Sequence, residues 1–188
     1  MVRERTSRLI RPLLMLLSGK VSPNQLTLLG LVTSTASFLS FWYDYIVIGA
    51  ILVLVTGFFD LLDGALARHT GEGSKWGAFL DSLVDRYTEI IIIAGISKFS
   101  TLGYLAITGS LLVSYSRSRA ELEGVKCDVG LGSRPTRLLI LGIVSPLPWG
   151  RDLSLIMVSI VAHSTALYRM FHTWNSLKNK RSSVVPMS

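Results

Sequence analysis

Long stretches of apolar residues constrain the fold of this chain more than any other feature. Five of them approach the roughly 18 residues that cross a bilayer as a helix, and prolines interrupt a sixth. They take up most of the 188 residues, so little is left for a separate soluble domain. Hydrophobic residues make up 49% of the chain and charged residues only 16%, which is unlike a soluble protein of this size. We therefore predict an all-α integral membrane protein.

The apolar stretches predict six transmembrane helices, preceded by a helix at the membrane interface. Residues 1–20 combine arginines with leucines in a basic amphipathic pattern, typical of a helix that lies among the lipid headgroups. We therefore expect an interfacial helix over 1–20, a six-helix domain over 21–174 and a basic, flexible tail over 175–188. The expected spans are 24–42, 45–68, 75–97, 102–119, 136–147 with its flanks, and 153–171.

The distribution of basic residues predicts the orientation of these spans. Of the 19 Lys and Arg residues, only Lys98 and Arg151 fall in the connections on one side, and Arg86 lies within a span. Because Lys and Arg accumulate in cytoplasmic loops, we expect a multi-pass protein of the cell membrane with both termini in the cytoplasm. The net charge of +7 then reflects this bias, and we predict no nucleic-acid partner.

Acidic side chains lie in or beside the second and third expected spans, where an unpaired charge is costly. Along a helix, members of an i,i+3 pair differ by about 60° and members of an i,i+4 pair by about 40°, so each pair projects from one face. Two such pairs facing each other would form a four-carboxylate cage suited to Mg²⁺ or Mn²⁺, with room for two ions. The alternative is a set of buried ion pairs with Arg68, Lys75 and Arg86. The acids are Asp60, Asp63, Asp81, Asp85 and Glu89.

Four of these aspartates belong to a longer motif. Residues 60–85 read D-x-x-D-G-x-x-A-R-x8-G-x3-D-x3-D, and this string resembles the signature of the CDP-alcohol phosphotransferase family at every fixed position. The resemblance implies a polar cavity open to the cytoplasm within six membrane helices, and a homodimer. It also implies transfer of a phosphatidyl-type group from a CDP-activated lipid to an alcohol, with release of CMP.

The same resemblance assigns roles to the aspartates. It implies that Asp60, Asp63 and Asp81 ligate one divalent cation, and that Asp81 and Asp85 help to hold a second. Asp85 is also the implied proton acceptor for the incoming hydroxyl, and hence the expected catalytic residue. The expected cofactor is therefore Mg²⁺ or Mn²⁺, two per active site, which would neutralise charge on the diphosphate.

A second set of residues is expected to hold the CDP-lipid. The string at 22–27 reads as a helix start, yet Asn24 and Thr27 share one helix face, and the family carries a similar Pro-Asn-x-x-Thr element at its CDP pocket. Glycines allow close approach of a ligand, and an arginine can fork onto a diphosphate. Ser74 falls where relatives contact the nucleotide, although it could equally cap the next helix. The set comprises Pro23, Asn24, Gln25, Thr27, Gly64, Ala67, Arg68, Ser74 and Gly77.

Arginines near the cytoplasmic side predict a phosphorylated acceptor. Arg134 and Arg137 share a face at a helix start, where backbone N–H groups also favour an anion. The strings YSRSRAE at 115–121 and RPTR at 134–137 resemble the branch that makes phosphatidylinositol phosphate or archaetidylinositol phosphate from inositol 1-phosphate. We therefore expect Arg117, Arg134 and Arg137 to bind the acceptor phosphate. The alternative for the first string is helical ion pairing of Arg117 with Glu121 and of Arg119 with Glu123.

Other functions remain as alternatives. Glycerol 3-phosphate, the acceptor of phosphatidylglycerophosphate synthases, is also an anion and would suit the same arginines. A cation transporter is a remote alternative, because its acids would be distributed across the bilayer whereas these cluster at one side. Membrane prenyltransferases also use two aspartate motifs, but place them much farther apart. The sequence leaves open whether the lipid substrate is CDP-diacylglycerol or CDP-archaeol.

Overall fold

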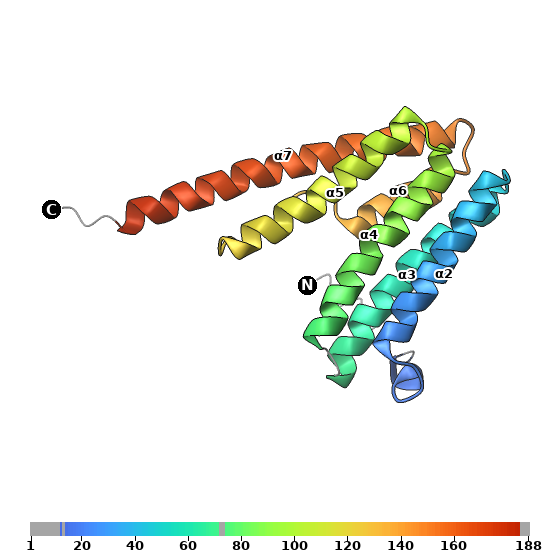
Figure 1. The fold of residues 1–188 in the computed structure, drawn as a ribbon, viewed down its shortest axis with the longest axis horizontal. Coiled ribbons are helices and arrows are strands. Elements are labelled where there is room, and N and C mark those ends of the chain that lie inside the picture. The colour runs from blue at the N-terminus through green and yellow to red at the C-terminus, as the bar shows by residue number, and fades with distance from the viewer. Residues whose placement is uncertain (1–11, 13, 72–73, 185–188) are drawn as a thin grey trace. The chain divides into compact units, whose positions relative to one another are not determined.

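The structure is a computed structural model that describes residue 12 and residues 14–71 and 74–184. Over these residues it contains helices and no β-strand, which confirms the all-α class (Figure 1). The helices overlap the apolar stretches of the sequence. They are α2 (Pro23–Trp42), α3 (Ile46–Thr70), α4 (Lys75–Ser97), α5 (Thr101–Leu122), α6 (Arg134–Val144) and α7 (Gly150–Val184).

Two of the described helices are long and apolar enough to cross a membrane. They are α3, in which a stretch of 18 residues has a mean hydropathy of 2.2, and the part of α7 over Gly150–Asn179, in which such a stretch has a mean hydropathy of 1.3. Carboxylates lower the hydropathy of α4, and serines, threonines and glycines lower that of α2 and α5. The total of six membrane spans therefore stays a prediction.

The helix α6 is shorter than the sequence predicts. A span was expected over 136–147 with its flanks, whereas α6 has 11 residues and ends at Val144. Its rise is about 16 Å, roughly half of the hydrocarbon thickness of a bilayer. Pro146 and Pro148 follow directly, and proline lacks the N–H group that would continue the helix. Turns therefore occupy residues 145–149, at the end of the expected span and in its flank.

Both ends of the chain contain helix where the structure describes them. Residues 1–11 and 13 of the expected interfacial helix lie outside the described residues, while 14–17 are helical. Leu14 is buried against Leu26, Leu62 and Leu66 of α2 and α3. At the other end the sequence predicts a flexible tail over 175–188, whereas α7 remains helical to Val184.

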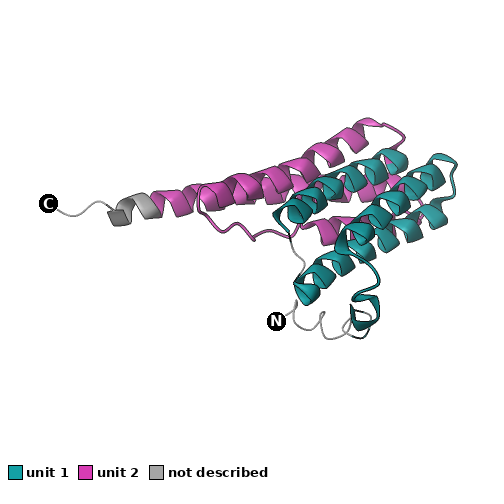
Figure 2. Ribbon diagram, turned by 60° about the horizontal axis from the view of Figure 1, so that its bottom comes forward, with its two compact units in different colours: residues 1–96 teal, residues 97–188 magenta. Residues whose placement is uncertain are grey.

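The helices form two compact units (Figure 2). The first, Met1–Ile96, contains α2, α3 and nearly all of α4, and the second, Ser97–Ser188, contains α5, α6 and α7. Every residue expected to hold metal or CDP-lipid belongs to the first unit. The three arginines expected to bind the acceptor belong to the second.

Small and hydroxyl side chains let α2 and α3 pack closely in the first unit. Thr33 and Thr56 share a hydrogen bond of 2.8 Å between their hydroxyls, and the buried Ser37 hydroxyl donates to the Gly49 carbonyl at 3.0 Å. A Cβ atom at Gly49 would lie 2.8 Å from the ring of Phe41. Close helix contact through small residues, supported by interhelical hydrogen bonds, is typical of packing in membranes.

The contact between α4 and α2 is tighter still. A Cβ atom at Gly95 would lie 2.7 Å from the Cα atom of Phe38 and 3.1 Å from its carbonyl oxygen. Backbone atoms cannot rotate away as the end of a side chain can. Only glycine therefore fits at this crossing, which fixes α4, the helix of Asp81 and Asp85, against α2.

We predict that Gly95→Ala lowers the thermal stability of the protein. The added methyl group forces α4 and α2 apart, and such overpacking typically costs about 1–3 kcal/mol. Thermal unfolding of the purified protein in detergent measures the effect. Gly30→Ala on α2 is the matched control, because a Cβ atom there would have no heavy atom within 4 Å. Equal melting temperatures for both variants would contradict the prediction.

Candidate functional site

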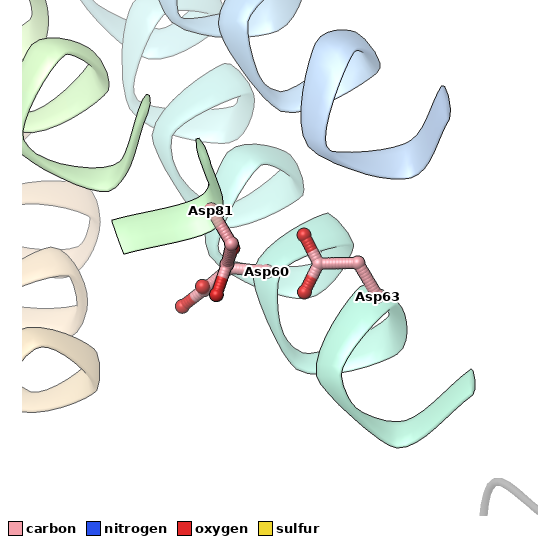
Figure 3. A group of neighbouring side chains, drawn as sticks. All are labelled: Asp60, Asp63 and Asp81. Atoms are coloured by element: carbon pink, nitrogen blue, oxygen red, sulfur yellow. The ribbon is translucent and has the colours of Figure 1, made fainter. Parts of the chain in front are cut away.

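Three carboxylates from two helices converge in the first unit. Asp60 and Asp63 come from α3 and Asp81 from α4, and one oxygen of each lies within 4.8 Å of the others (Figure 3). The i,i+3 spacing on α3 places Asp60 and Asp63 on one face, as the sequence predicts. The structure thus brings together three of the four residues that were expected to bind metal.

Asp63 is held by hydrogen bonds to both of its oxygens. Its Oδ2 accepts from the Thr27 hydroxyl of α2 at 2.9 Å, and its Oδ1 accepts from the backbone N–H of Gly64. The side chain is buried, with 5% of its surface exposed. These two donors fix the direction of the carboxylate, and the Thr27 contact explains why a threonine four positions after Pro23 faces the site.

The donor set suits a hard divalent cation. Carboxylate oxygens are the ligands that Mg²⁺ and Mn²⁺ prefer, and three of them converge on one point. Gathering three negative charges is unfavourable unless a cation or a proton compensates them. Asp60, Asp63 and Asp81 therefore fit the implied metal site, and they come from helices whose positions are fixed by α2.

Asp85 lies outside this group of three. Its side chain is only 18% exposed, and its Oδ2 lies 3.8 Å from the NH1 atom of Arg86. This contact belongs to the ion-pair alternative that the sequence left open. Asp85 is nevertheless one turn along α4 from Asp81, on the same helix face. Its expected roles, as ligand and as proton acceptor, stay predictions.

Three of the expected CDP-lipid residues meet at the start of α4. The Ser74 hydroxyl accepts from the Gly77 N–H at 2.9 Å, so Ser74 caps α4, as the sequence alternative proposes. A Cβ atom at Gly77 would lie 3.1 Å from Ser74 Oγ and 3.4 Å from Asn24 Oδ1. Asn24 of α2 therefore points at the same spot, and the missing side chain of Gly77 keeps it open.

Of the other expected CDP-lipid residues, some serve the local structure of α2, whereas others are exposed or partly exposed on α3. Ser22 and Gln25 form a reciprocal capping box at the start of α2, with Pro23 in the first turn, so local structure accounts for Pro23 and Gln25. Arg68 is exposed and folds back over Gly64, where a Cβ atom would lie 3.2 Å from its NH1. Ala67 is partly exposed one position before Arg68.

The arginines of the second unit already have protein partners. Arg117 contacts Glu121 at 2.8 Å and Asp128 at 3.6 Å, and Arg119 contacts Glu123 at 2.7 Å. The helical ion pairs that the sequence raised as an alternative are therefore formed. These side chains are about half exposed, and exposed pairs of this kind are worth only tenths of a kcal/mol. A more highly charged anion can displace such partners.

Arg134 and Arg137 occupy different environments although both begin α6. Arg134 is partly exposed, whereas Arg137 is 1% exposed and donates from NH1 to the carbonyl of Gly132. The sequence predicts that both lie on one face at a helix start, and α6 does begin at Arg134. Binding of the acceptor phosphate by either residue stays a prediction.

The sequence does not predict the structural role of one buried arginine, Arg169. Arg169 was counted among the cytoplasmic loop charges, but it lies on α7 with 4% of its surface exposed. Its guanidinium donates to the carbonyls of Val129 at 2.9 Å and Val113 at 2.6 Å. The available signal was an arginine inside the apolar stretch 153–171, because a charge there needs internal partners.

Comparison with known proteins decides the family. The family model described as CDP-alcohol phosphatidyltransferase matches residues 20–168, which include all of the residues expected to bind metal, CDP-lipid or the acceptor. The chain belongs to this family. It is therefore a CDP-alcohol phosphotransferase, as the motif at 60–85 indicates.

Several relatives carry more specific names. The chain is 36% identical over 162 residues to an archaetidylinositol phosphate synthase of Methanothermobacter thermautotrophicus, covering 81% of this chain and 83% of that protein. It is 37% identical over 164 residues to one of Pyrococcus horikoshii, covering 84% and 86%. A phosphatidylinositol phosphate synthase of Mycobacteroides abscessus is 32% identical over 151 residues, covering 74% and 69%.

Solved structures of a phosphatidylinositol phosphate synthase of Mycobacterium tuberculosis share this fold. The structure with manganese and citrate has a TM-score of 0.76 at 27% identity, covering 87% of this chain and 88% of that one. The structure with CDP-DAG bound has a TM-score of 0.72 at 28% identity, covering 90% and 93%. The manganese bound in the first of these structures and the three carboxylates of this chain together support divalent-metal binding by this enzyme.

We predict that Asp60→Asn and Asp81→Asn each weaken metal binding at least tenfold. Each substitution replaces a charged oxygen ligand by a neutral amide, which hard cations bind less well. Mn²⁺ binding followed by electron paramagnetic resonance measures this directly, apart from activity. Asp44→Asn in the α2–α3 turn is the matched control, since asparagine also tolerates its positive φ of 63°. Unchanged Mn²⁺ affinity in both site variants would remove the carboxylates from the metal site.

Proposed function

We propose that this enzyme transfers the phosphatidyl or archaetidyl group of a CDP-activated lipid to inositol 1-phosphate and releases CMP. The observation that carries the proposal is the convergence of Asp60, Asp63 and Asp81 within a chain of this family. The choice of acceptor is supported by the relatives at 32–37% identity that are named archaetidylinositol or phosphatidylinositol phosphate synthases. The strings at 115–121 and 134–137 support the same choice.

In this proposal the start of α4 receives the nucleotide half of the lipid substrate. Asn24 offers an amide, Ser74 a hydroxyl, and Gly77 a surface without a side chain, and these three groups surround one spot. Arg68, exposed beside Gly64, presents a fork of N–H donors to the diphosphate. Together they orient the bond that must break.

The chemical step is a direct displacement. The hydroxyl oxygen of the acceptor attacks the β-phosphorus, the bond from that phosphorus to the oxygen of CMP breaks, and Asp85 accepts the hydroxyl proton. When bound by Asp60, Asp63 and Asp81, with a second ion also held by Asp85, Mg²⁺ or Mn²⁺ supplies positive charge that neutralises the leaving CMP. Direct displacement needs no covalent intermediate on the protein.

The acceptor phosphate is assigned to the arginines of the second unit. Arg117, Arg134 and Arg137 supply the positive charge, and the weak exposed pairs of Arg117 with Glu121 and Asp128 give way to a phosphate with higher charge. A phosphorylated alcohol is thereby favoured over free inositol or serine. The arginines would serve glycerol 3-phosphate as well, so this acceptor is the alternative outcome of the test.

The setting that we propose is a multi-pass protein of the cell membrane. Its apolar stretches form six spans, the basic residues place both termini and the active site in the cytoplasm, and two copies associate as a homodimer. Support comes from α3 and α7, which are long enough to cross a bilayer, and from the bias of Lys and Arg to one side of the chain.

A panel of acceptors tests the proposed reaction. The purified protein in detergent is supplied with CDP-diacylglycerol or CDP-archaeol and with Mg²⁺ or Mn²⁺. CMP release is then measured with inositol 1-phosphate, glycerol 3-phosphate, serine and free inositol. Release that depends on inositol 1-phosphate is expected. Release only with glycerol 3-phosphate would overturn the acceptor while leaving the family and the metal site in place.

We predict that Asp85→Asn reduces turnover at least a hundredfold while the affinity for CDP-lipid changes little. An amide cannot accept the hydroxyl proton, whereas the three remaining carboxylates still hold a cation at the diphosphate. Steady-state kcat and the binding of CDP-lipid in the absence of acceptor separate the two effects. Asp152→Asn, at the exposed start of α7, is the matched control. A kcat within tenfold of the parent would exclude Asp85 as the proton acceptor.

A further inference from the structure

The connection between α5 and α6, residues 123–133, runs along α7 and is held there by a series of hydrogen bonds. As this connection proceeds from 126 to 132, its partners on α7 run in the opposite direction, from 172 back to 165. Each contact joins a side chain of α7 to a backbone atom of the connection. The contacts are His172 Nε2 with the Lys126 carbonyl at 3.2 Å, Arg169 Nε with the Val129 carbonyl at 2.9 Å, and Thr165 Oγ1 with the Gly132 N–H at 2.9 Å.

Thr165 is the point of closest approach. It is buried, with 4% of its surface exposed. A Cβ atom at Gly132 would lie 2.7 Å from Thr165 Oγ1 and 2.8 Å from the Val161 carbonyl, and one at Gly130 would lie 2.5 Å from Thr165 Cγ2. Gly130 also has a φ of +94°, which side chains rarely adopt. The two glycines therefore let the backbone lie directly on Thr165.

Both polar backbone groups of Gly132 are in use. Its N–H donates to Thr165 Oγ1, and its carbonyl accepts from NH1 of Arg137. Arg137 is the largest of the fully buried side chains, at 1% exposure, so contacts within the protein determine where its guanidinium lies. The hydroxyl of Thr165 and the guanidinium of Arg137 are thus linked through a single residue.

We propose that Thr165 is a positioning residue for the acceptor site, which it serves by fixing Gly132 and thereby the guanidinium of Arg137. This inference rests on the proposed function, because it takes Arg137 as a residue that binds the acceptor phosphate. Thr165 acts through the backbone of the connection and needs no contact with the substrate. The neutral hydroxyl of Thr165 accepts a hydrogen bond from the buried N–H of Gly132. Without this oxygen the N–H group would lose this partner.

Kinetics of Thr165 variants test the proposal in the full-length protein in detergent. Thr165→Val keeps the shape of the side chain but removes the acceptor oxygen, so the KM for inositol 1-phosphate should rise about fivefold to twentyfold. The KM for CDP-lipid should stay within about twofold of the parent. Thr165→Ser keeps the hydroxyl and should restore the acceptor KM to within about threefold, a rescue that loss of packing alone would not show.

Two further variants make the result decisive. Thr173→Val is the matched control on α7, because the Thr173 hydroxyl donates back to its own helix at the Arg169 carbonyl and meets the connection in a long contact, 4.0 Å from Cys127 Sγ. It should leave the acceptor KM unchanged. Gly132→Ala adds a methyl group that pushes the connection away from Thr165, so it should also raise the acceptor KM. This variant therefore tests the proposal even if Thr165→Val does not fold.

The proposal is overturned by any of three results. These are an unchanged acceptor KM in Thr165→Val or, if that variant does not fold, in Gly132→Ala; an equal rise in the KM for both substrates; and the same shift in Thr173→Val. A failure of the proposed function is seen separately, in the parent protein. If the parent releases CMP only with glycerol 3-phosphate, the acceptor KM of each variant is measured with that substrate, and the same criteria decide the role of Thr165.

Discussion

The rest of the structure depends on bringing three carboxylates together on two helices. With oxygens of Asp60, Asp63 and Asp81 within 4.8 Å of one another, each charged pair repels by at least about 3.5 kcal/mol at an effective dielectric constant of about 20. That repulsion opposes folding of the first unit unless a cation compensates it. The same repulsion gives the site its affinity for a divalent cation, so the function of the site and its cost to folding have one origin.

The packing of the first unit can be understood as the means of holding these charges. Thr27 of α2 bonds Asp63, and the contacts of Thr33 and Ser37 farther along α2 set how α2 lies on α3. Gly95 brings α4 against the backbone of α2. Each of the two helices that carry carboxylates is therefore fixed against the same third helix. Small residues allow this, because a larger side chain at either crossing would separate the acids.

The second unit solves a different problem, which is to hold several cations near one another, since Arg117 and Arg137 both act electrostatically on Arg169. Arg117 and Arg119 are half exposed and paired with carboxylates, whereas Arg137 and Arg169 are buried and bonded to backbone carbonyls. Backbone carbonyls satisfy a guanidinium without cancelling its charge. The positions of these two buried arginines therefore depend on the backbone of α5 and of the connection between α5 and α6.

The sequence by itself determined the all-α class, the family, and the pairing of acids on helix faces, because all of these follow from local spacing. The 26 positions from Asp60 to Asp85 carry the family signature, and the i,i+3 spacing on α3 does place Asp60 and Asp63 together. The early end of α6 could also have been read locally, from Pro146 and Pro148. Only the tertiary structure decided that Asp81, and not Asp85, joins the α3 pair, that Thr27 bonds Asp63, and that Arg169 holds the connection. Helical spacing specifies which residues share a face. Which faces meet depends on contacts between residues far apart in the chain, and no local pattern encodes those.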